Sequence, residues 1–155
     1  MESCDSLVRM GIHLRSVVLD TTDVPRLAEF YRQLLGWRYP DGFEVGPQDF
    51  LDWRSIEGPD GERISFQLAG AVTPTTWPEP AVPQQLHLDF MLDSVQELQE
   101  WHQRALDLGA VVRMDQSDDE EEPLRVYADP AGHMFCLFTR PDGNSDKTSD
   151  DAGNG

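Results

Sequence analysis

Residues 17–36, VVLDTTDVPRLAEFYRQLLG, decide the fold, because they combine a short apolar strand with a capped amphipathic helix that ends in glycine. The same order returns in residues 86–109, LHLDFMLDSVQELQEWHQRALDLG, and further strands follow each copy. An internal repeat of this kind predicts two βαβ-type modules in one small chain. Because two such modules joined edge to edge enclose a concave surface, we expect the functional site between them.

The first helix is bounded by local signals at both ends. Thr22 or Asp23 can act as its N-cap, since each offers a side-chain oxygen to the free backbone amides. Pro25 falls in the first turn, where its missing amide proton costs nothing, and Gly36 suits the left-handed residue that ends a helix. Five apolar residues share one helical face and should pack on the sheet: Leu27, Phe30, Tyr31, Leu34 and Leu35.

The second helix has signals of the same kind. Ser94 and Glu97 match a capping box, in which two side chains accept the helix-end amides, and Gly109 closes the helix. The predicted apolar face consists of Val95, Leu98, Trp101 or His102, Ala105 and Leu108.

Apolar runs between turn signals predict the strands around these helices. We expect strands at 13–20, around 43–45, around 50–56, at 62–69, 86–92, 110–114, 124–128 and 133–139. Residues 71–85 contain four prolines and should form an extended linker between module one, at about 13–70, and module two, at about 86–140. We expect a single domain at 12–140, between a flexible leader at 1–11 and a disordered acidic tail at 141–155.

The composition excludes several classes of protein. The 155 residues carry a formal net charge of −17, which argues against a nucleic-acid partner, since such binding needs clustered Lys and Arg. No apolar run is long enough to span a membrane, and no signal-peptide pattern is present. The two cysteines, Cys4 and Cys136, form no disulfide framework, so we expect a cytoplasmic protein. The acidic run at 118–122 is interpreted as a solvated loop.

Side chains in a strand alternate between two faces, so the strand residues divide into a helix-facing set and a set that faces the hollow. The second set is small, polar and mixed, which is typical of a ligand cavity, although a water-exposed sheet face would look the same. Trp53 could stack on an aromatic ligand or pack against the core. The predicted ligand-pocket residues are Ser16, Asp20, Trp53, Gln67, His87, Asp89 and Cys136.

Four segments together resemble the vicinal oxygen chelate superfamily, which includes glyoxalase I, extradiol dioxygenases and bleomycin-resistance proteins. They are DVPRLAEFYRQLLG at 23–36, LHLD at 86–89, LGA at 108–110 and DPAGHMFCL at 129–137. The LGW step at 35–37 is similar to that of glyoxalase-like domains of actinobacteria, many of which have no assigned reaction. The resemblance implies an α+β fold in which two paired βαβββ modules form a cup-shaped mixed sheet with the helices outside.

The resemblance also implies where a divalent metal would bind. Metalloenzymes of the superfamily take one ligand from the first and one from the last strand of each module, and these positions fall on Ser16, Gln67, His87 and Cys136. A metal-binding member usually carries Glu at the last position; Ser is a poor ligand, and a neutral Cys supplies no carboxylate charge. His87 and Gln67 are the candidate ligands for Ni, Zn, Fe or Mn, with Asp20 or Asp89 able to supply charge. Otherwise His87 is a hydrogen-bonded residue of the cup wall, and Cys136 a small buried one.

These observations predict a protein that binds a small organic molecule in the cup between its modules, with no full metal site. The alternative is a divalent-metal-dependent lyase, isomerase or dioxygenase that acts on the vicinal oxygens of its substrate. A third interpretation, in which the acidic run at 118–122 docks a basic partner, rests on charge alone. A homodimer is common among relatives, but two modules can already complete a cup, so the oligomeric state is left open.

Overall fold

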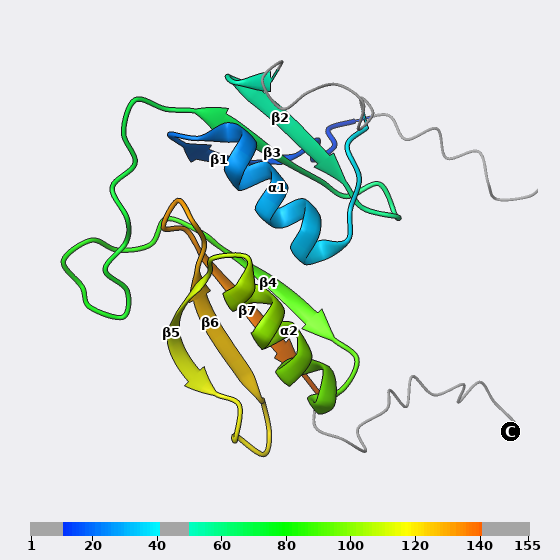
Figure 1. Ribbon diagram of the computed structural model, residues 1–155, viewed down its shortest axis with the longest axis vertical. Helices are drawn as coiled ribbons and strands as arrows, with labels where there is room; N and C mark the ends of the chain where they lie inside the picture. Colours follow the sequence, from blue (N-terminus) through cyan, green and yellow to red (C-terminus); the bar gives the residue numbers. More distant parts are fainter. Residues whose placement is uncertain (1–10, 41–49, 141–155) are drawn as a thin grey trace, which may run out of the picture.

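The computed structural model describes residues 11–40 and 50–140, which form two modules, each with a sheet covered by one helix (Figure 1). Module one consists of β1 (Val17–Thr21), α1 (Val24–Leu35), β2 (Trp53–Glu57) and β3 (Arg63–Leu68). Module two consists of β4 (His87–Leu92), α2 (Val95–Asp107), β5 (Val111–Gln116), β6 (Leu124–Ala128) and β7 (Met134–Thr139). The predicted α+β class is confirmed.

The two sheets share one plan, in which the first strand of the module pairs in parallel with the last. The strand orders are β1-β3-β2 and β4-β7-β6-β5, and the remaining pairs are antiparallel. In module two, β5 pairs with the outer edge of β6. At the equivalent outer edge of β2 in module one, Arg38 forms an isolated antiparallel bridge to Glu57. The predicted strand around 43–45, the predicted tail and all of the predicted leader except Gly11 lie outside the described residues.

The predicted boundaries of α1 are confirmed at both ends. Asp23 is the N-cap, and its Oδ1 accepts a hydrogen bond from the backbone amide of Arg26 at 3.2 Å. Gly36 follows the helix with φ of +68°, and its amide donates to the carbonyl of Arg32. These two caps set which side chains face the sheet, and Leu27, Tyr31 and Leu34 are accordingly buried.

The capping of α2 differs from the prediction in one contact. The Oγ of Ser94 accepts from the amide of Glu97 at 3.2 Å, as expected. The Oε2 of Glu97 accepts from the amide of Asp93 at 3.0 Å, one residue before the N-cap. The helix ends at Asp107, and Gly109 has φ of +106°, so the predicted stop is confirmed.

The first strand begins later than the sequence suggests. Strand β6 spans the predicted residues 124–128, whereas β1 starts at Val17 and not at residue 13. Val17 pairs with Ile64, and β3 begins only one residue earlier, at Arg63. Residues 13–15 therefore lie beyond the end of the partner strand, and an isolated extended segment forms no ladder.

A cluster of aromatic rings joins the two modules. Tyr31 of α1 stacks on Phe66 of β3, with ring centroids 5.8 Å apart, and meets Phe135 of β7 edge-on at 6.0 Å. Phe30 lies 5.8 Å from Phe135, which stacks on Tyr127 at 5.1 Å. All five side chains are buried. Helix α1 thus packs on its own sheet and on module two, so one apolar core serves both modules.

Glu29 on α1 provides a pH-dependent contribution to stability. Its carboxylate accepts from Arg32 at 2.8 Å, from the hydroxyl of Tyr39 at 2.7 Å and from Gln33 at 2.9 Å. The Arg32 hydrogen bond, aided by the other two and opposed by burial, lowers the pKa of Glu29 from 4.5 to about 2. A carboxyl group whose pKa is lowered in the folded state stabilises the fold at pH values above its ordinary pKa of 4.5. This contribution is lost as the pH falls through the lowered pKa.

We therefore expect Glu29→Gln to lower the free energy of unfolding by about 1 kcal/mol at neutral pH, a value reduced for partial solvent exposure. The difference between the variant and the wild-type protein should shrink between pH 4.5 and about 2. Urea unfolding followed by circular dichroism across this range measures it. A difference that stays constant with pH would show that the carboxylate charge has no part in the effect.

Candidate functional site

Each sheet has one face packed on its helix and one open face. In β1, Leu19 is 1% exposed under α1, whereas its neighbour Val18 is 37% exposed on the opposite face. Asp20 lies on the same face as Val18, and its register partner on β3 is Gln67. The predicted division between the two faces holds for Val18, Leu19 and Asp20 of β1, whereas Leu68 of β3, predicted to lie under a helix, is 44% exposed.

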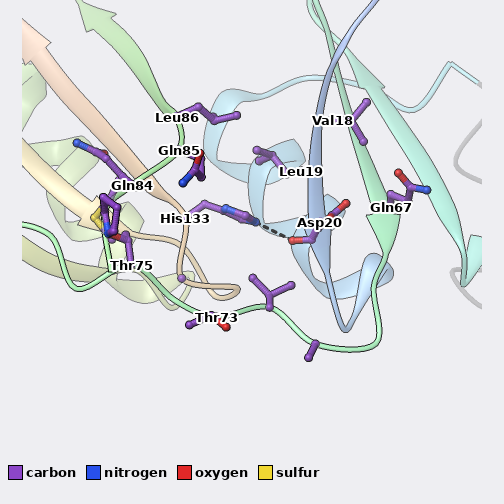
Figure 2. A pocket seen from close by; sticks show the side chains of 15 residues that line it. Val18, Leu19, Asp20, Gln67, Thr73, Thr75, Gln84, Gln85, Leu86 and His133 are labelled. Atoms are coloured by element: carbon purple, nitrogen blue, oxygen red, sulfur yellow. Dashed lines mark hydrogen bonds between the residues drawn. The ribbon is translucent and has the colours of Figure 1, made fainter. Parts of the chain in front are cut away.

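A cavity on these faces lies between the two modules, and we call it the inter-module cavity. It has a volume of about 590 Å³ and is walled by β1, the end of β3, both ends of the linker and the β6–β7 turn. Figure 2 shows Asp20 and Gln67 on one side, Thr75 and Gln84 of the linker on the other, and His133 between them. The remaining lining residues are Val18, Leu19, Ala71, Val72, Thr73, Pro83, Gln85, Leu86, Gly132 and Met134.

His133 connects the modules at this cavity. Its Nε2 lies 2.6 Å from the backbone carbonyl of Asp20 in β1, drawn as a dashed line in Figure 2. Because a carbonyl oxygen can only accept, Nε2 carries the proton of this hydrogen bond. The Nε2–H group of His133 therefore holds the β6–β7 turn against β1.

Asp129 fixes the same turn from inside. Its Oδ1 accepts from the amides of Ala131 at 2.9 Å and His133 at 3.0 Å, and its Oδ2 accepts from the hydroxyl of Tyr31 at 2.6 Å. Both side chains are buried, and burial raises the pKa of Asp129 and that of Tyr31. The hydrogen bond from Tyr31 to Asp129 connects α1 of module one to the β6–β7 turn of module two. It therefore fixes the position of this turn, which is one wall of the cavity, relative to module one.

The linker approaches this turn at Gly132. A Cβ at this position would lie 2.7 Å from the Cβ of Pro74, and φ is +91°. Both the close contact and the left-handed backbone require glycine here. Pro74 can therefore pack directly on the turn, which places the linker as one wall of the inter-module cavity.

The linker contains no helix or strand, as predicted, but it folds back on itself. The amide of Thr76 donates to the carbonyl of Val82 at 2.9 Å, and the amide of Val82 donates to the Oγ1 of Thr76 at 2.8 Å. Thr75 Oγ1 donates to the same carbonyl at 2.6 Å. This closed loop carries Trp77, whose side chain lines a second cavity.

The second cavity lies on the open face of the module-two sheet, and we call it the module-two pocket. Its volume is about 310 Å³, and it shares one wall residue, Gln84, with the inter-module cavity. It is lined by Trp77, Gln84, His87, Asp89, Met114, Gln116, Glu122, Leu124, Val126, Cys136 and Phe138.

The structure does not bring all of the predicted ligand-pocket residues into one site. Asp20 and Gln67 line the inter-module cavity, and three others line the module-two pocket: His87, Asp89 and Cys136. Ser16 and Trp53 line neither cavity. The Oγ of Ser16 lies 2.6 Å from the Oγ of Ser65, and Trp53 is 45% exposed beside Gln67. The predicted residues are thus distributed over two cavities, which share Gln84 of the linker as a wall residue.

The comparisons with known proteins agree with this architecture. A family profile described as "Glyoxalase-like domain" matches residues 16–138, which include every strand and helix except the last residue of β7. The chain belongs to the glyoxalase-like domain family. A search of curated proteins gives no significant match.

Several solved structures share the fold of this glyoxalase-like domain. A glyoxalase/bleomycin resistance protein/dioxygenase family enzyme from Burkholderia phytofirmans has a TM-score of 0.64 and 15% identity, covering 83% of this chain and 99% of that chain. The fosfomycin resistance protein FosX from Mesorhizobium loti has a TM-score of 0.61 and 15% identity, covering 84% and 93%. FosX from Listeria monocytogenes, described in complex with Mn(II) and a phosphonic acid, has a TM-score of 0.60 and 16% identity, covering 83% and 90%.

The donor side chains of this glyoxalase-like domain do not fit a divalent-metal centre. No group of three or more His, Cys, Asp or Glu side chains that could hold a metal ion occurs within residues 11–40 and 50–140. His87 Nε2 and Asp89 Oδ1 lie 3.4 Å apart, but the Gln67 side chain lines the other cavity. Burial, with a smaller effect of Asp89 and Glu122, raises the pKa of the Cys136 thiol to about 12, whereas a metal ligand must be the thiolate.

The cavities also contain residues outside the predicted set, among them His133, Glu122 and Gln84. His133 follows a turn glycine, and Glu122 belongs to an acidic run, so both read as solvent-exposed residues. Gln84 lies in a proline-rich linker, where nothing in the pattern shows that the chain folds back. Only the polar pair at 84–85, directly before β4, gives a signal that could have been used.

None of the helices in the described part of the chain is long and apolar enough to cross a membrane.

Proposed function

We propose that this glyoxalase-like protein binds a small organic molecule in the inter-module cavity, without metal catalysis. The proposal is carried by one observation: a cavity of about 590 Å³ walled by both modules and the linker. This volume is within the range of small-molecule sites in proteins. Asp20, Gln67 and His133 provide polar groups beside apolar contacts from Val18 and Met134.

The lining favours recognition through neutral hydrogen bonds. Amides of Gln67, Gln84 and Gln85 and hydroxyls of Thr73 and Thr75 can donate or accept. Asp20 is the one carboxylate, and no Lys or Arg lines this cavity in the described part of the chain. Arg and Lys are the residues that bind phosphonate-type anions, so we do not propose a phosphonate ligand such as that of the Listeria FosX complex.

A panel of uncharged, oxygen-bearing organic compounds tests this proposal by thermal shift, followed by calorimetric titration of the compounds that raise the melting temperature. Gln67→Ala should weaken a binding compound about tenfold, the value of one lost hydrogen bond and its packing. Gln103→Ala is the matched control, because that glutamine lies on α2 and donates to Asp107. Equal affinity for the Gln67 variant and the wild-type protein would contradict the proposed site.

The metal-dependent alternative has its own test. The FosX from Listeria is described with Mn(II), and His87 and Asp89 are the nearest approach to a ligand pair in this chain. We expect elemental analysis of protein purified without a tag or chelator to find no stoichiometric Ni, Zn, Fe or Mn. A stoichiometric metal that is lost in His87→Ala would replace our proposal with a metal-dependent lyase, isomerase or dioxygenase.

We also propose a cellular location, a class of partner and a family subgroup for the protein. We place it in the cytoplasm, with a small molecule as its partner and with no role for nucleic acid or membrane. We also group it with the actinobacterial glyoxalase-like domains, on the LGW step at 35–37. A homodimer is compatible with this function, and light scattering at the concentrations used for titration would determine the oligomeric state.

A further inference from the structure

We propose that the module-two pocket is a second ligand site, separate from the inter-module cavity, and that it takes a small organic cation with an aromatic or aliphatic body. Two features of its lining lead to this class of ligand: an apolar floor with an aromatic wall, and a rim that carries negative charge only.

The apolar part comes from the open face of the module-two sheet. Met114, Leu124, Val126 and Phe138 lie on three adjacent strands, β5, β6 and β7, and all four line the pocket. The side chain of Trp77 reaches it from the linker loop. An apolar floor of this kind binds a hydrocarbon or ring, and a Trp face also attracts a cation placed over it.

The charged part consists of two carboxylates. Asp89 and Glu122 line the pocket, and no Lys or Arg lines it among the residues that the structure describes. The Asp89 carboxylate has a single neighbour for ion pairing, His87 Nε2 at 3.4 Å, and its side chain is 53% exposed. The Glu122 carboxylate has no hydrogen-bond or ion-pair partner in the described part of the chain. Negative charge at this rim is therefore not neutralised by the protein itself.

Cys136 provides an independent observation at the floor of the same pocket. Its side chain is only 9% exposed, lines the pocket and has no hydrogen-bond partner in the described part of the chain. Burial, with Asp89 and Glu122 adding to it, raises the pKa of the thiol to about 12, so the thiol stays protonated at neutral pH. The floor at Cys136 is therefore uncharged, and the negative charge among the lining residues of this pocket comes from Asp89 and Glu122.

The combination favours an organic cation over an inorganic one. Ca²⁺ takes six to eight oxygen ligands, and an apolar floor gives an inorganic cation no compensation for the water that it loses. An ammonium group attached to an aromatic ring satisfies both halves of the pocket. Its charge can lie between Asp89 and Glu122 while its ring covers Val126 and Phe138 beside Trp77.

Three compounds of similar shape separate charge from apolar contact: phenethylamine, phenethyl alcohol and hydrocinnamate. We would titrate each into the whole chain at about pH 8 and low salt, where electrostatic screening is weak. Amide NMR shifts give the affinity and the location together. We expect phenethylamine to bind about tenfold tighter than the alcohol, and hydrocinnamate weaker than both, with shifts on β4, β6 and β7. Equal binding of the amine and the alcohol would overturn the proposal.

A charge-matched pair of double variants completes the test. Asp89→Asn with Glu122→Gln should reduce the affinity for phenethylamine to that for the alcohol. Asp118→Asn with Glu120→Gln removes the same charge from the exposed acidic loop and should leave the affinity within about twofold. Equal losses in both double variants would show a general effect of net charge and overturn the proposed site.

Failure of the second site can be distinguished from failure of the function proposed for the inter-module cavity. Gln67→Ala, which should weaken ligands of the inter-module cavity, is expected to leave phenethylamine binding unchanged. A loss of phenethylamine binding in that variant would place the cation in the inter-module cavity and overturn the second site. Absence of any binding by phenethylamine would also overturn it, while the panel titration would still decide the proposed function.

Discussion

Replacement of Asp129 by alanine is expected to lower the free energy of unfolding by about 3 kcal/mol, because three donors lose their acceptor at a buried position. These donors are the hydroxyl of Tyr31 and the amides of Ala131 and His133. The Tyr31 side chain is fully buried, so its hydroxyl would lose its acceptor at a place away from bulk water. Part of the loss is offset, since burial raises the pKa of Asp129 and its ionised form is costly in the folded state.

Asp129→Asn is the control for this prediction. The amide oxygen can still accept from the two backbone amides, so we expect it to retain most of the stability. A raised pKa also means that ionisation of Asp129 destabilises the fold as the pH rises through that value, and the asparagine variant should lack this dependence. Urea unfolding of the two variants and the wild-type protein measures both effects. An alanine variant as stable as the asparagine variant would show that the turn does not depend on this acceptor.

The second large effect is expected at Phe135. Its ring is fully buried and meets four other rings, at centroid distances of 5.8 Å for Phe30, 6.0 Å for Tyr31, 6.3 Å for Phe90 and 5.1 Å for Tyr127. Phe135→Ala should lower the free energy of unfolding by about 4 kcal/mol, from lost transfer energy and the cavity left behind.

Because the rings around Phe135 come from both modules, the thermal transition should shift as one cooperative step. Met91→Ala is the control, since Met91 lies on the neighbouring strand β4 and is 50% exposed; a change of less than about 1 kcal/mol is expected there. Differential scanning calorimetry measures both variants. Two separate transitions in Phe135→Ala, with one unchanged, would contradict a core that serves both modules.

The elements of the fold could be predicted where the signals are local. The ends of α1 are determined by Asp23, Pro25 and Gly36. These residues act through their backbone conformation and through hydrogen bonds to the free backbone amides, and both depend only on residues nearby in the sequence. The start of β1 could not be predicted in this way, because it depends on where the partner strand β3 begins, at Arg63. A strand boundary is a property of a pair of segments, and apolar alternation describes only one of them.

The sequence predicted on which face of each sheet these residues lie, but not that they line two separate cavities. Alternation correctly placed Asp20, Gln67, His87 and Asp89 on the open faces of the sheets, since this depends only on the strand period. It could not show that the linker would line both cavities, because contacts such as that of Pro74 with Gly132 join residues far apart in the sequence. Residues brought to a cavity by such a contact carry no periodic signal.

The most direct test of the central claim is the structure of the protein with a bound compound from the neutral panel. We predict density for the compound between β1 and the linker, within hydrogen-bond distance of Gln67 or His133, with the β6–β7 turn unmoved. A compound bound on the helix-covered side of either sheet, or a panel in which no member binds more tightly than about 1 mM, would contradict the account.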